Sequence, residues 1–281
     1  MGTVYTDAST AGYHTEGHPE APWRVTRAAE RLRAAGHSLL APDQEPSDEA
    51  ILKVHSPRHL ESLRRGGYSD PDTPHYPQIE AIARVSLAGA LSAAAKAKAG
   101  EPAFSLMRPP GHHAGRERVA GFCYLNNIAI ACAGLAPERV AIVDVDVHHG
   151  DGTEEWAFGK EGVSFLSLHQ SPLYPGSGRA SRGNCRNVPL EPGTGEAAYL
   201  RELERALQAA LELKPQVLGV SAGFDTYKEC PLAQLRLDAA TYKRIGRMLA
   251  QASPRRFAVL EGGYAEALPL LIERFLDGFF A

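Results

Sequence analysis

Residues 141–153 read Ala-Ile-Val-Asp-Val-Asp-Val-His-His-Gly-Asp-Gly-Thr, and this stretch decides how the rest of the chain is interpreted. Its first half is short, apolar and β-branched, which is typical of a buried strand. Its second half carries three carboxylates and two histidines between Asp144 and Asp151. Carboxylates are costly to bury unless a partner group compensates their charge. The stretch therefore predicts a buried strand that ends in a metal site, a proton relay or both.

Strand-like and helix-like patterns alternate along the chain, without a low-complexity linker or an internal repeat. This alternation predicts an α/β fold with a mostly parallel sheet, and apolar runs such as 217–220 indicate strands that are covered on both faces. We expect a single domain over residues 1–281. The predicted strands are 3–6, 103–107, 140–145, 163–168, 216–221 and 257–260, and the predicted helices are 22–35, a short one that opens at 47, 57–65, 78–99, 126–135, 196–213, 239–252 and 265–275. Residues 171–187 are rich in glycine, proline and serine and are predicted to form a long loop.

The composition argues against several classes of protein. With 281 residues and a formal net charge of −3, the chain offers no basic surface suited to nucleic acid. No apolar run has the length of a membrane span, and the N-terminus lacks the basic and apolar segments of a secretion signal. The four cysteines show no CxxC spacing, which suits reduced thiols in the cytoplasm. The sequence gives no indication of the oligomeric state.

Unusual polar residues follow four of the predicted strands directly. In parallel sheets, ligands bind beyond the carboxyl ends of the strands, so we expect these side chains to converge on one crevice. They are His112 and His113 after strand 103–107, Asp146, His148 and Asp151 after strand 140–145, Asp225 after strand 216–221, and Tyr264 after strand 257–260.

Asp146 and His148 stand two positions apart, so in an extended chain their side chains point to the same side. Together with Asp225 from another strand end, they can supply three ligands to one ion. Three protein ligands that leave one position open are typical of a catalytic zinc site. Because two carboxylates and one imidazole form a rather hard set, Fe(II), Co(II) and Mn(II) also suit it. An isolated Asp-x-His is more often a satisfied loop pair, and it is the neighbouring groups that favour a metal.

Two histidines after a rigid turn are the candidate bases. Residues 108–114 read Arg-Pro-Pro-Gly-His-His-Ala, in which the prolines fix the approach and the glycine permits a tight bend. Asp144 and Asp151 are available to orient the two imidazoles, and a carboxylate on one ring nitrogen raises the basicity of the ring. Tyr264, which follows two glycines, can donate its hydroxyl to a developing oxyanion. Together these groups describe metal-assisted hydrolysis.

Spaced motifs over nearly the whole chain resemble those of the histone deacetylase family, which also contains acetoin-utilisation proteins and acetylpolyamine amidohydrolases. The resemblance implies the three-layer α/β/α arginase–deacetylase fold, and short chains of this type resemble prokaryotic members. The motifs are GHPEAPWR at 17–24, VHSP at 54–57, RPPGHHA at 108–114, GFCYLNN at 121–127, DVDVHHGDGT at 144–153, SLH at 167–169, GFD at 223–225 and EGGY at 261–264.

The resemblance implies a zinc-dependent amidohydrolase that removes acetyl or short acyl groups from lysine side chains or from related small amides. It leaves open which histidine is the general acid. The residues that it assigns are Asp146, His148 and Asp225 to zinc, the pairs His112–Asp144 and His113–Asp151 to proton transfer with His113 as the general base, and Tyr264 to the oxyanion.

The same resemblance assigns residues to a substrate tunnel and to a second ion. Asp72 would anchor the substrate backbone, and Arg24 would lie on an internal channel near the acetate exit. Gly121, Phe122 and Tyr174 would line the tunnel. A structural potassium ion is implied at the backbone oxygens of Asp144, Asp146, His148 and Leu168 and the Ser167 hydroxyl. His149 receives no assignment, and we expect it to be structural.

Two positions depart from the family pattern. Cys230 precedes Pro231-Leu232 where the family usually has an acidic residue near the Asp225 loop. Leu232 stands where one polyamine-selective branch has a gatekeeper glutamate, which argues against the same selectivity device here.

Three alternatives to a lysine deacetylase are considered. An acetylpolyamine amidohydrolase would use the same chemistry, so the substrate stays open between acetylated protein lysine and a small acetylated amine. An arginase-like ureohydrolase with two manganese ions would need an Asp-x-His-x-Asp arrangement, which the stretch around Asp144 does not have. A catalytically silent acetyl-lysine binding module would have lost Tyr264, a metal ligand or His113, and none of these is lost.

Overall fold

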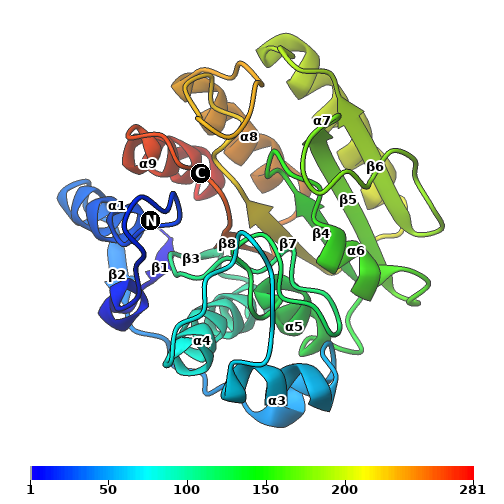
Figure 1. The fold of residues 1–281 in the computed structure, drawn as a ribbon. Coiled ribbons are helices and arrows are strands. Elements are labelled where there is room, and N and C mark those ends of the chain that lie inside the picture. Colours follow the sequence, from blue (N-terminus) through cyan, green and yellow to red (C-terminus); the bar gives the residue numbers. More distant parts are fainter. Residues whose placement is uncertain (1) are drawn as a thin grey trace.

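Eight parallel strands form one sheet in the order β2-β1-β3-β8-β7-β4-β5-β6 in the computed structural model, which describes residues 2–281 (Figure 1). The predicted α/β fold with a mostly parallel sheet is thereby confirmed. The strands are β1 (Thr3–Tyr5), β2 (Ser38–Leu40), β3 (Ala103–Ser105), β4 (Val140–Asp144), β5 (Val163–Gln170), β6 (Cys185–Leu190), β7 (Val217–Ala222) and β8 (Arg256–Leu260).

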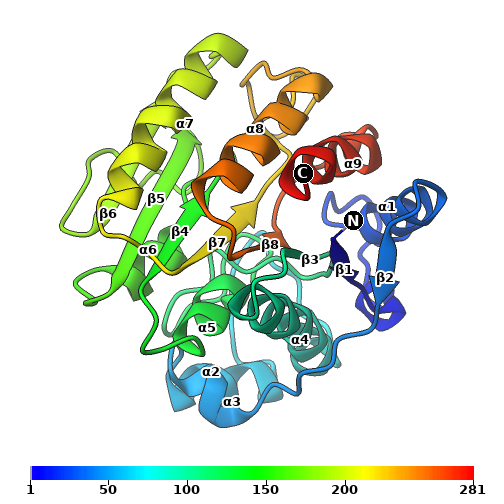
Figure 2. The same ribbon diagram turned by 180° about the vertical axis from the view of Figure 1, so that it is seen from behind.

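Helices cover both faces of the sheet, so the molecule has three layers (Figures 1 and 2). Helices α1, α7, α8 and α9 pack with the sheet in one hydrophobic core, and α4 and α5 pack in the other. The short helices α2 and α3 join a smaller cluster beneath α4 and α5. The helices are α1 (Trp23–Ala34), α2 (Asp48–Leu52), α3 (Pro57–Arg65), α4 (Ile79–Lys98), α5 (Asn127–Ala133), α6 (Asp151–Ala157), α7 (Glu196–Leu211), α8 (Ala239–Ala252) and α9 (Leu268–Phe279), with a 3-10 turn at Ala8–Ala11.

Strand β4 shows why an apolar strand suits the middle of this sheet. Ala141 and Val143 belong to the core under α7 and α8, whereas Val140 and Ile142 belong to the core under α4 and α5. Successive side chains of a strand point to opposite faces, and burial of a valine or isoleucine stabilises the fold by about 1.5–3 kcal/mol. Packing on both faces fixes the register of β4, and the register places Asp144 at the carboxyl end of the strand.

Local sequence accounts well for several element boundaries. Helix α3 begins after Ser56, whose hydroxyl accepts a hydrogen bond from the backbone of His59, and it ends at Gly66 in the left-handed conformation. Its bounds are those predicted, and the same holds for α8. A serine N-cap, a proline at the first turn and a glycine C-cap are strong local signals, so the prediction did not depend on distant contacts.

Two strands and one α-helix were missed, and each lacks such a signal. Strand β2 is a short, largely exposed edge strand. The predicted loop 171–187 was too long, because β6 begins at Cys185 and forms the other edge of the sheet. Its Pro189 weakened the strand pattern, although proline is tolerated on an edge strand. Helix α6 begins at Asp151, inside the stretch for which only a strand was predicted.

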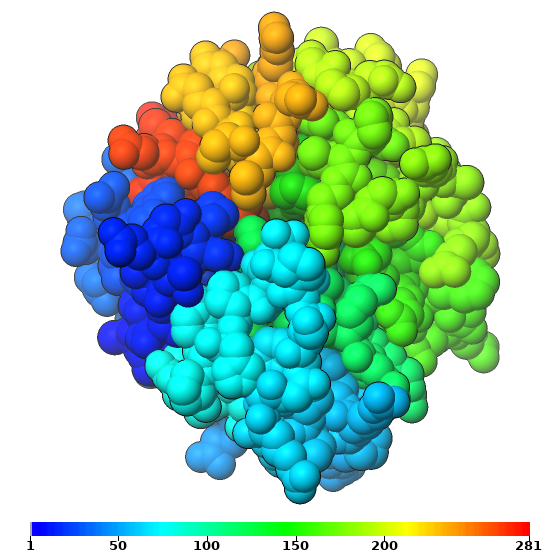
Figure 3. Space-filling model, in the orientation of Figure 1, coloured from blue at the N-terminus to red at the C-terminus, as the bar shows by residue number. Residues whose placement is uncertain are grey.

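The face at the carboxyl ends of the strands is hollowed near its centre, where segments from both halves of the chain meet (Figure 3). Within residues 2–281, no helix is long and apolar enough to cross a membrane. Phe275 and Phe279 of α9 are buried in the core, and Phe280 is partly buried against it.

Candidate active site

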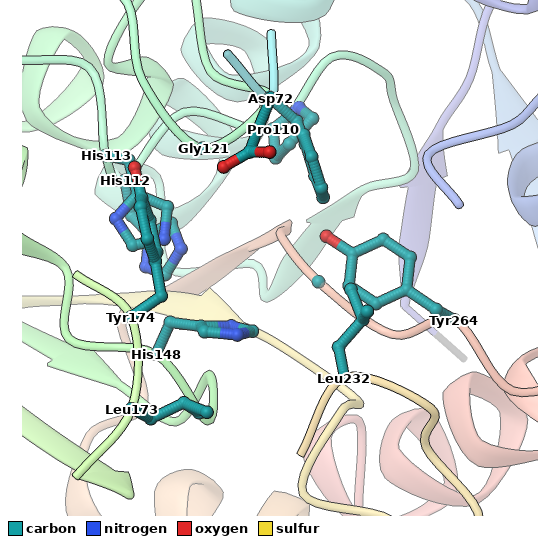
Figure 4. Close-up of a pocket in the computed structure, with 12 residues that line it drawn as sticks. Asp72, Pro110, His112, His113, Gly121, His148, Leu173, Tyr174, Leu232 and Tyr264 are labelled. Atoms are coloured by element: carbon teal, nitrogen blue, oxygen red, sulfur yellow. The ribbon is translucent and has the colours of Figure 1, made fainter. Parts of the chain in front are cut away.

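Four neighbouring strands, β3, β8, β7 and β4, bring the polar strand-end residues together. Their side chains surround a cavity of about 230 Å³ whose lining includes His112, His113, His148 and Tyr264. In Figure 4 the histidines and the tyrosine lie on opposite sides of this cavity. Adjacent parallel strands end at the same edge of a sheet, which is why residues far apart in the sequence meet here.

Asp146, His148 and Asp225 form a compact group beneath the cavity. Each offers one ligand atom, and these atoms all lie within 4.8 Å of one another. His148 Nδ1 lies 3.0 Å from Asp146 Oδ1 and 3.3 Å from Asp225 Oδ2. No other group of this kind occurs among residues 2–281.

The surroundings of this group fit a divalent metal ion. Asp225 Oδ2 is buried without a hydrogen-bond partner, which is unusual for a carboxylate unless a cation compensates it. The other oxygen atoms are held in place, since Val147 donates its backbone N–H to Asp225 Oδ1 (2.9 Å) and Gly262 donates its N–H to Asp146 Oδ2 (2.7 Å). A Cβ atom at Gly262 would lie 2.1 Å from Asp225 Oδ2, so only glycine leaves the group its space.

His112 and Asp144 form the deeper of two histidine–carboxylate pairs. His112 Nδ1 lies 2.9 Å from Asp144 Oδ2, and both residues are buried. Burial alone would lower the pKa of His112, but Asp144 and Asp146 raise it well above its ordinary value. The two carboxylates therefore favour the protonated form of the His112 imidazole.

His113 and Asp151 form the second pair, at the wall of the cavity. His113 Nδ1 lies 2.7 Å from Asp151 Oδ1. Burial and the neighbouring His112 lower the pKa of His113 to about 4, despite the opposing effect of Asp151. Arg118 donates to the other carboxylate oxygen, Asp151 Oδ2, at 2.5 Å. No sequence pattern singles out Arg118, because it stands among other charged residues of an exposed turn.

Tyr264 faces the two histidines across the cavity (Figure 4). Burial raises the pKa of its hydroxyl well above the ordinary value, so the group keeps its proton. Arg24 lies behind the ring, with its guanidinium carbon 4.8 Å from the ring centroid. It donates to the backbone carbonyls of Gly263 (2.8 Å) and Glu261 (2.5 Å). These bonds fix the turn that carries Tyr264.

Gly121, Phe122 and Tyr174 line the cavity, and so does Asp72, which is exposed and therefore lies at the mouth. Gly121 and Phe122 both adopt positive φ angles, 53° and 70°. A Cβ atom at Gly121 would lie 2.4 Å from His113 Cδ2 and 3.1 Å from Tyr174 Cε1, so the backbone here is in direct contact with both rings. Phe122 donates its N–H to the hydroxyl of Thr73 at 2.8 Å, which ties this turn to the Asp72 loop.

A buried ion-pair network lies behind the site and was not predicted. Glu20 accepts from Arg24 Nη1 (2.9 Å) and from two nitrogen atoms of Arg108 (2.6 Å each). Arg24 thus belongs to this network and does not line the cavity. Glu20 and Arg108 stand in the quoted motifs, so their types were visible in the sequence, but their pairing across 88 positions was not.

The structure shows the surroundings of the two positions that depart from the family pattern, Cys230 and Leu232. Cys230 is buried. Leu232 lines the cavity, so the position of the gatekeeper glutamate is occupied here by an apolar side chain.

Comparison with known proteins agrees with this geometry. A sequence model of the histone deacetylase domain matches residues 18–276. A probable deacetylase of Methanothermobacter thermautotrophicus is 40% identical, over 95% of this chain and 88% of its own length. A histone deacetylase-like amidohydrolase of Pseudomonas aeruginosa is 37% identical, over 89% and 73%.

A solved structure extends the comparison to the fold. The acetylpolyamine aminohydrolase of Burkholderia pseudomallei superposes with a TM-score of 0.92 at 28% identity and covers 100% of this chain and 99% of its own. The three-layer arginase–deacetylase architecture is thereby confirmed. With the family model, these similarities support a hydrolytic deacetylase. The chain belongs to the histone deacetylase family.

Proposed function

We propose that the protein is a zinc-dependent amidohydrolase that removes acetyl groups from the side-chain amine of lysine. The observation that carries the proposal is one cavity in which two histidine–carboxylate pairs and Tyr264 surround the group Asp146, His148 and Asp225. Hydrolysis of an amide needs a base for water, a donor for the oxyanion and a proton for the leaving amine, and this cavity offers a candidate for each.

The metal would be held by Asp146, His148 and Asp225. When bound, a divalent ion supplies Lewis-acid polarisation of the amide carbonyl and lowers the pKa of water. The donor set of two carboxylates and one imidazole suits zinc and also Fe(II) or Co(II).

His113 takes the proton from the attacking water. The lowered pKa of His113 leaves its imidazole neutral and able to accept a proton, whereas the raised pKa of His112 makes that ring the poorer candidate for a free base. Asp151 orients His113 through Nδ1, so that Nε2 is the atom available to the water. After attack, the proton on His113 is available to the leaving amine.

Tyr264 donates its hydroxyl to the oxyanion that develops on the carbonyl. A donor aimed at developing charge in a dry site lowers the barrier most when it is already in place. The contacts of Arg24 with the turn before Tyr264 supply this preorganisation.

Acetyl-lysine in a peptide is the proposed substrate. Phe122, Tyr174 and Leu232 give the cavity apolar walls that suit the methylene chain of a lysine, and Asp72 lies at the mouth, where a peptide backbone would pass. Acetylpolyamine is the second candidate, because the structural relative named above acts in that class. Leu232 in place of a glutamate favours the first.

Two further proposals concern a second ion, which the family resemblance implies, and the compartment. A potassium ion would be held by carbonyls of Asp144, Asp146, His148 and Leu168 and by the Ser167 hydroxyl; the support is that Asp144 and Ser167 are register partners on neighbouring strands. The cytoplasm is the proposed compartment, since all four cysteines are free and buried.

The test is the rate of acetate release from an acetyl-lysine peptide, compared with acetylputrescine and acetylspermidine, with and without a chelator. We expect the peptide to be the best substrate and the chelator to abolish the rate. The variant Asp225→Ala should lose both bound metal and activity. Full metal content and full activity in this variant would show that the ligand assignment is wrong.

A further inference from the structure

One wall of the cavity comes from residues 171–184, the segment between β5 and β6 that contributes Leu173 and Tyr174. Both side chains lie beside His148 in Figure 4. Tyr174 is 40% exposed, and its ring centroid lies 5.1 Å from that of His113. The segment contains no helix or strand of its own, so its position depends on what lies beneath it.

Two buried histidines lie directly under this segment. His149 Nδ1 lies 2.8 Å from the hydroxyl of Ser177, and His169 Nε2 lies 3.0 Å from the carbonyl oxygen of Gly178. The centroids of the two rings are 4.7 Å apart, and neither ring takes part in the proposed chemistry. Ser177 follows Tyr174 by three positions, so these contacts hold the chain close to the cavity wall.

The fit between the segment and the histidines is tight. Gly178 has a φ angle of 74°, and a Cβ atom there would lie 2.6 Å from both His149 Cγ and His169 Nε2. Only a residue without a side chain allows this approach. The backbone of the segment therefore rests on the two imidazole rings.

Glu154 of α6 is the centre of the same network. Its carboxylate is 6% exposed, and Oε2 lies 2.5 Å from His149 Nε2 and accepts a hydrogen bond from Asn187 Nδ2 at 3.0 Å. Oε1 pairs with Arg182, near the end of the segment. Asn187 also donates to the carbonyl of Ala180 at 3.0 Å. Glu154 thus connects α6, β6 and the wall segment.

The carboxylate of Glu154 is ionised at neutral pH. Burial would raise its pKa, but the close contact with His149 and the hydrogen bonds from Asn187 and Arg182 lower it to about 2. Hydrogen bonds to a charged group are stronger than those between neutral groups, so an ionised carboxylate holds its three partners better than an amide would.

We propose that Glu154 is a positioning residue of the cavity. Through His149, Asn187 and Arg182, it determines the position of residues 171–184, the wall segment that carries Tyr174. The kinetic readout of this inference rests on the proposed deacetylation. His113, Tyr264 and the metal ligands come from other strand ends, so displacement of the wall weakens contact with the substrate chain and leaves the reacting groups in place. The value of KM should therefore rise while kcat changes little.

The experiment compares Glu154→Gln with wild type and with the control Glu161→Gln, an exposed glutamate just after α6. KM and kcat are measured on an acetyl-lysine peptide. In parallel, the rate of trypsin cleavage after Arg179, which is exposed within the segment, reports on the wall without reference to activity. Arg182→Gln removes one partner from the solvent side and serves as a second, milder variant.

We expect Glu154→Gln to raise KM about tenfold with kcat within about twofold of wild type, and to be cleaved faster than the control. Arg182→Gln should change both readouts in the same direction and by less. Wild-type KM and wild-type cleavage in both variants would overturn the proposal, as would a loss of kcat together with a lowered melting temperature and lost metal. If wild type does not hydrolyse the peptide, the proposed function fails, and the trypsin comparison still decides whether Glu154 holds the wall.

Discussion

Glu261 accepts a hydrogen bond from the backbone N–H of His112, with Oε2 lying 3.1 Å from that nitrogen atom. The same oxygen accepts the N–H of Gly111 at 2.7 Å, and the other oxygen, Oε1, is buried without a partner. Glu261 stands at the end of β8, three positions before Tyr264. One carboxylate therefore joins the loop that carries the two histidines to the loop that carries the proposed oxyanion donor.

This carboxylate should make the stability of the metal-free protein depend on pH. Burial raises the pKa of Glu261 to about 7, although His112 and the N–H of Gly111 oppose the rise. The folded protein keeps a proton on Glu261 up to about pH 7, whereas the unfolded chain releases it near pH 4.5. The free energy of unfolding therefore falls as pH rises from 4.5 to about 7 and stays low above pH 7.

The variant Glu261→Gln keeps an acceptor for both N–H groups and removes the charge. In chelated protein we expect it to exceed wild type in the free energy of unfolding by on the order of 3 kcal/mol at pH 8, and to equal wild type near pH 4.5. Urea unfolding at the two pH values measures the difference. Parallel pH dependence in the two proteins would contradict the expectation, and the exposed Glu161→Gln is the control.

The sequence predicted the residues of the candidate site better than their environment. Asp146, His148, Asp225 and Tyr264 each follow a strand directly, and parallel strands place such residues at one edge whatever the details of packing. The roles of Glu261 and Arg118 depend on loops that approach each other in space. Arg118 pairs with Asp151 from 33 positions away, and no local pattern encodes that contact.

The fold shows the same difference between features that are encoded locally and features that depend on distant contacts. Strand β4 and helix α3 carry their signals in their own residues and were predicted. The edge strands β2 and β6 are held by pairing with a neighbour, and their own patterns are short or interrupted by proline. Elements that depend on tertiary pairing are the ones that sequence patterns miss.

Replacement of Tyr264 by phenylalanine should remove the oxyanion donor and little else. The ring contacts with Arg24 and Phe122 remain, because they do not involve the hydroxyl. We expect kcat on an acetyl-lysine peptide to fall about 100- to 1,000-fold, with the bound metal unchanged by elemental analysis. Tyr76→Phe, which loses only a hydroxyl contact to Thr15, is the matched control and should keep wild-type kcat. Equal kcat in the two variants would exclude the assigned role.

His113→Ala should separate proton transfer from metal binding. The imidazole of His113 pairs with Asp151 and lies outside the group of proposed metal ligands. Loss of a general base typically costs about 100- to 10,000-fold in rate, and we expect turnover to fall by that factor while metal content stays near one per chain. The exposed His14→Ala serves as the control. If His113→Ala kept turnover near that of wild type, another residue would have to be the general base.

Gly150→Ala should disturb the pair His112–Asp144 by steric contact alone. The φ angle of Gly150 is −74°, which alanine adopts freely, but its Cβ atom would lie 2.1 Å from Asp144 Oδ2 and 3.2 Å from His112 Nδ1. We expect a loss of about 1–3 kcal/mol in stability, typical of overpacking, together with reduced kcat. Gly195→Ala has open space around its Cβ and a φ of −97°, so it should behave as wild type. Similar effects in both variants would rule out the steric explanation.

Glu20→Gln should destabilise the protein more than any of these changes. Glu20 is 1% exposed, and its carboxylate compensates two buried guanidinium groups, those of Arg24 and Arg108. Removal of one partner from a buried ion pair leaves an uncompensated charge and costs about 3–5 kcal/mol.

The pH dependence of that loss gives a second check. Burial would raise the pKa of Glu20, but Arg108 and Arg24 lower it to about 2. A carboxylate with a lowered pKa contributes stability above its ordinary pKa near 4.5, and the contribution disappears as pH falls through the folded-state value. The gap between wild type and Glu20→Gln in urea unfolding should therefore be full at pH 7 and narrow towards pH 2. If the difference in the free energy of unfolding were the same at both pH values, the loss would come from the packing of the side chain and not from its charge. The exposed Glu45→Gln is the control and should match wild type at both pH values.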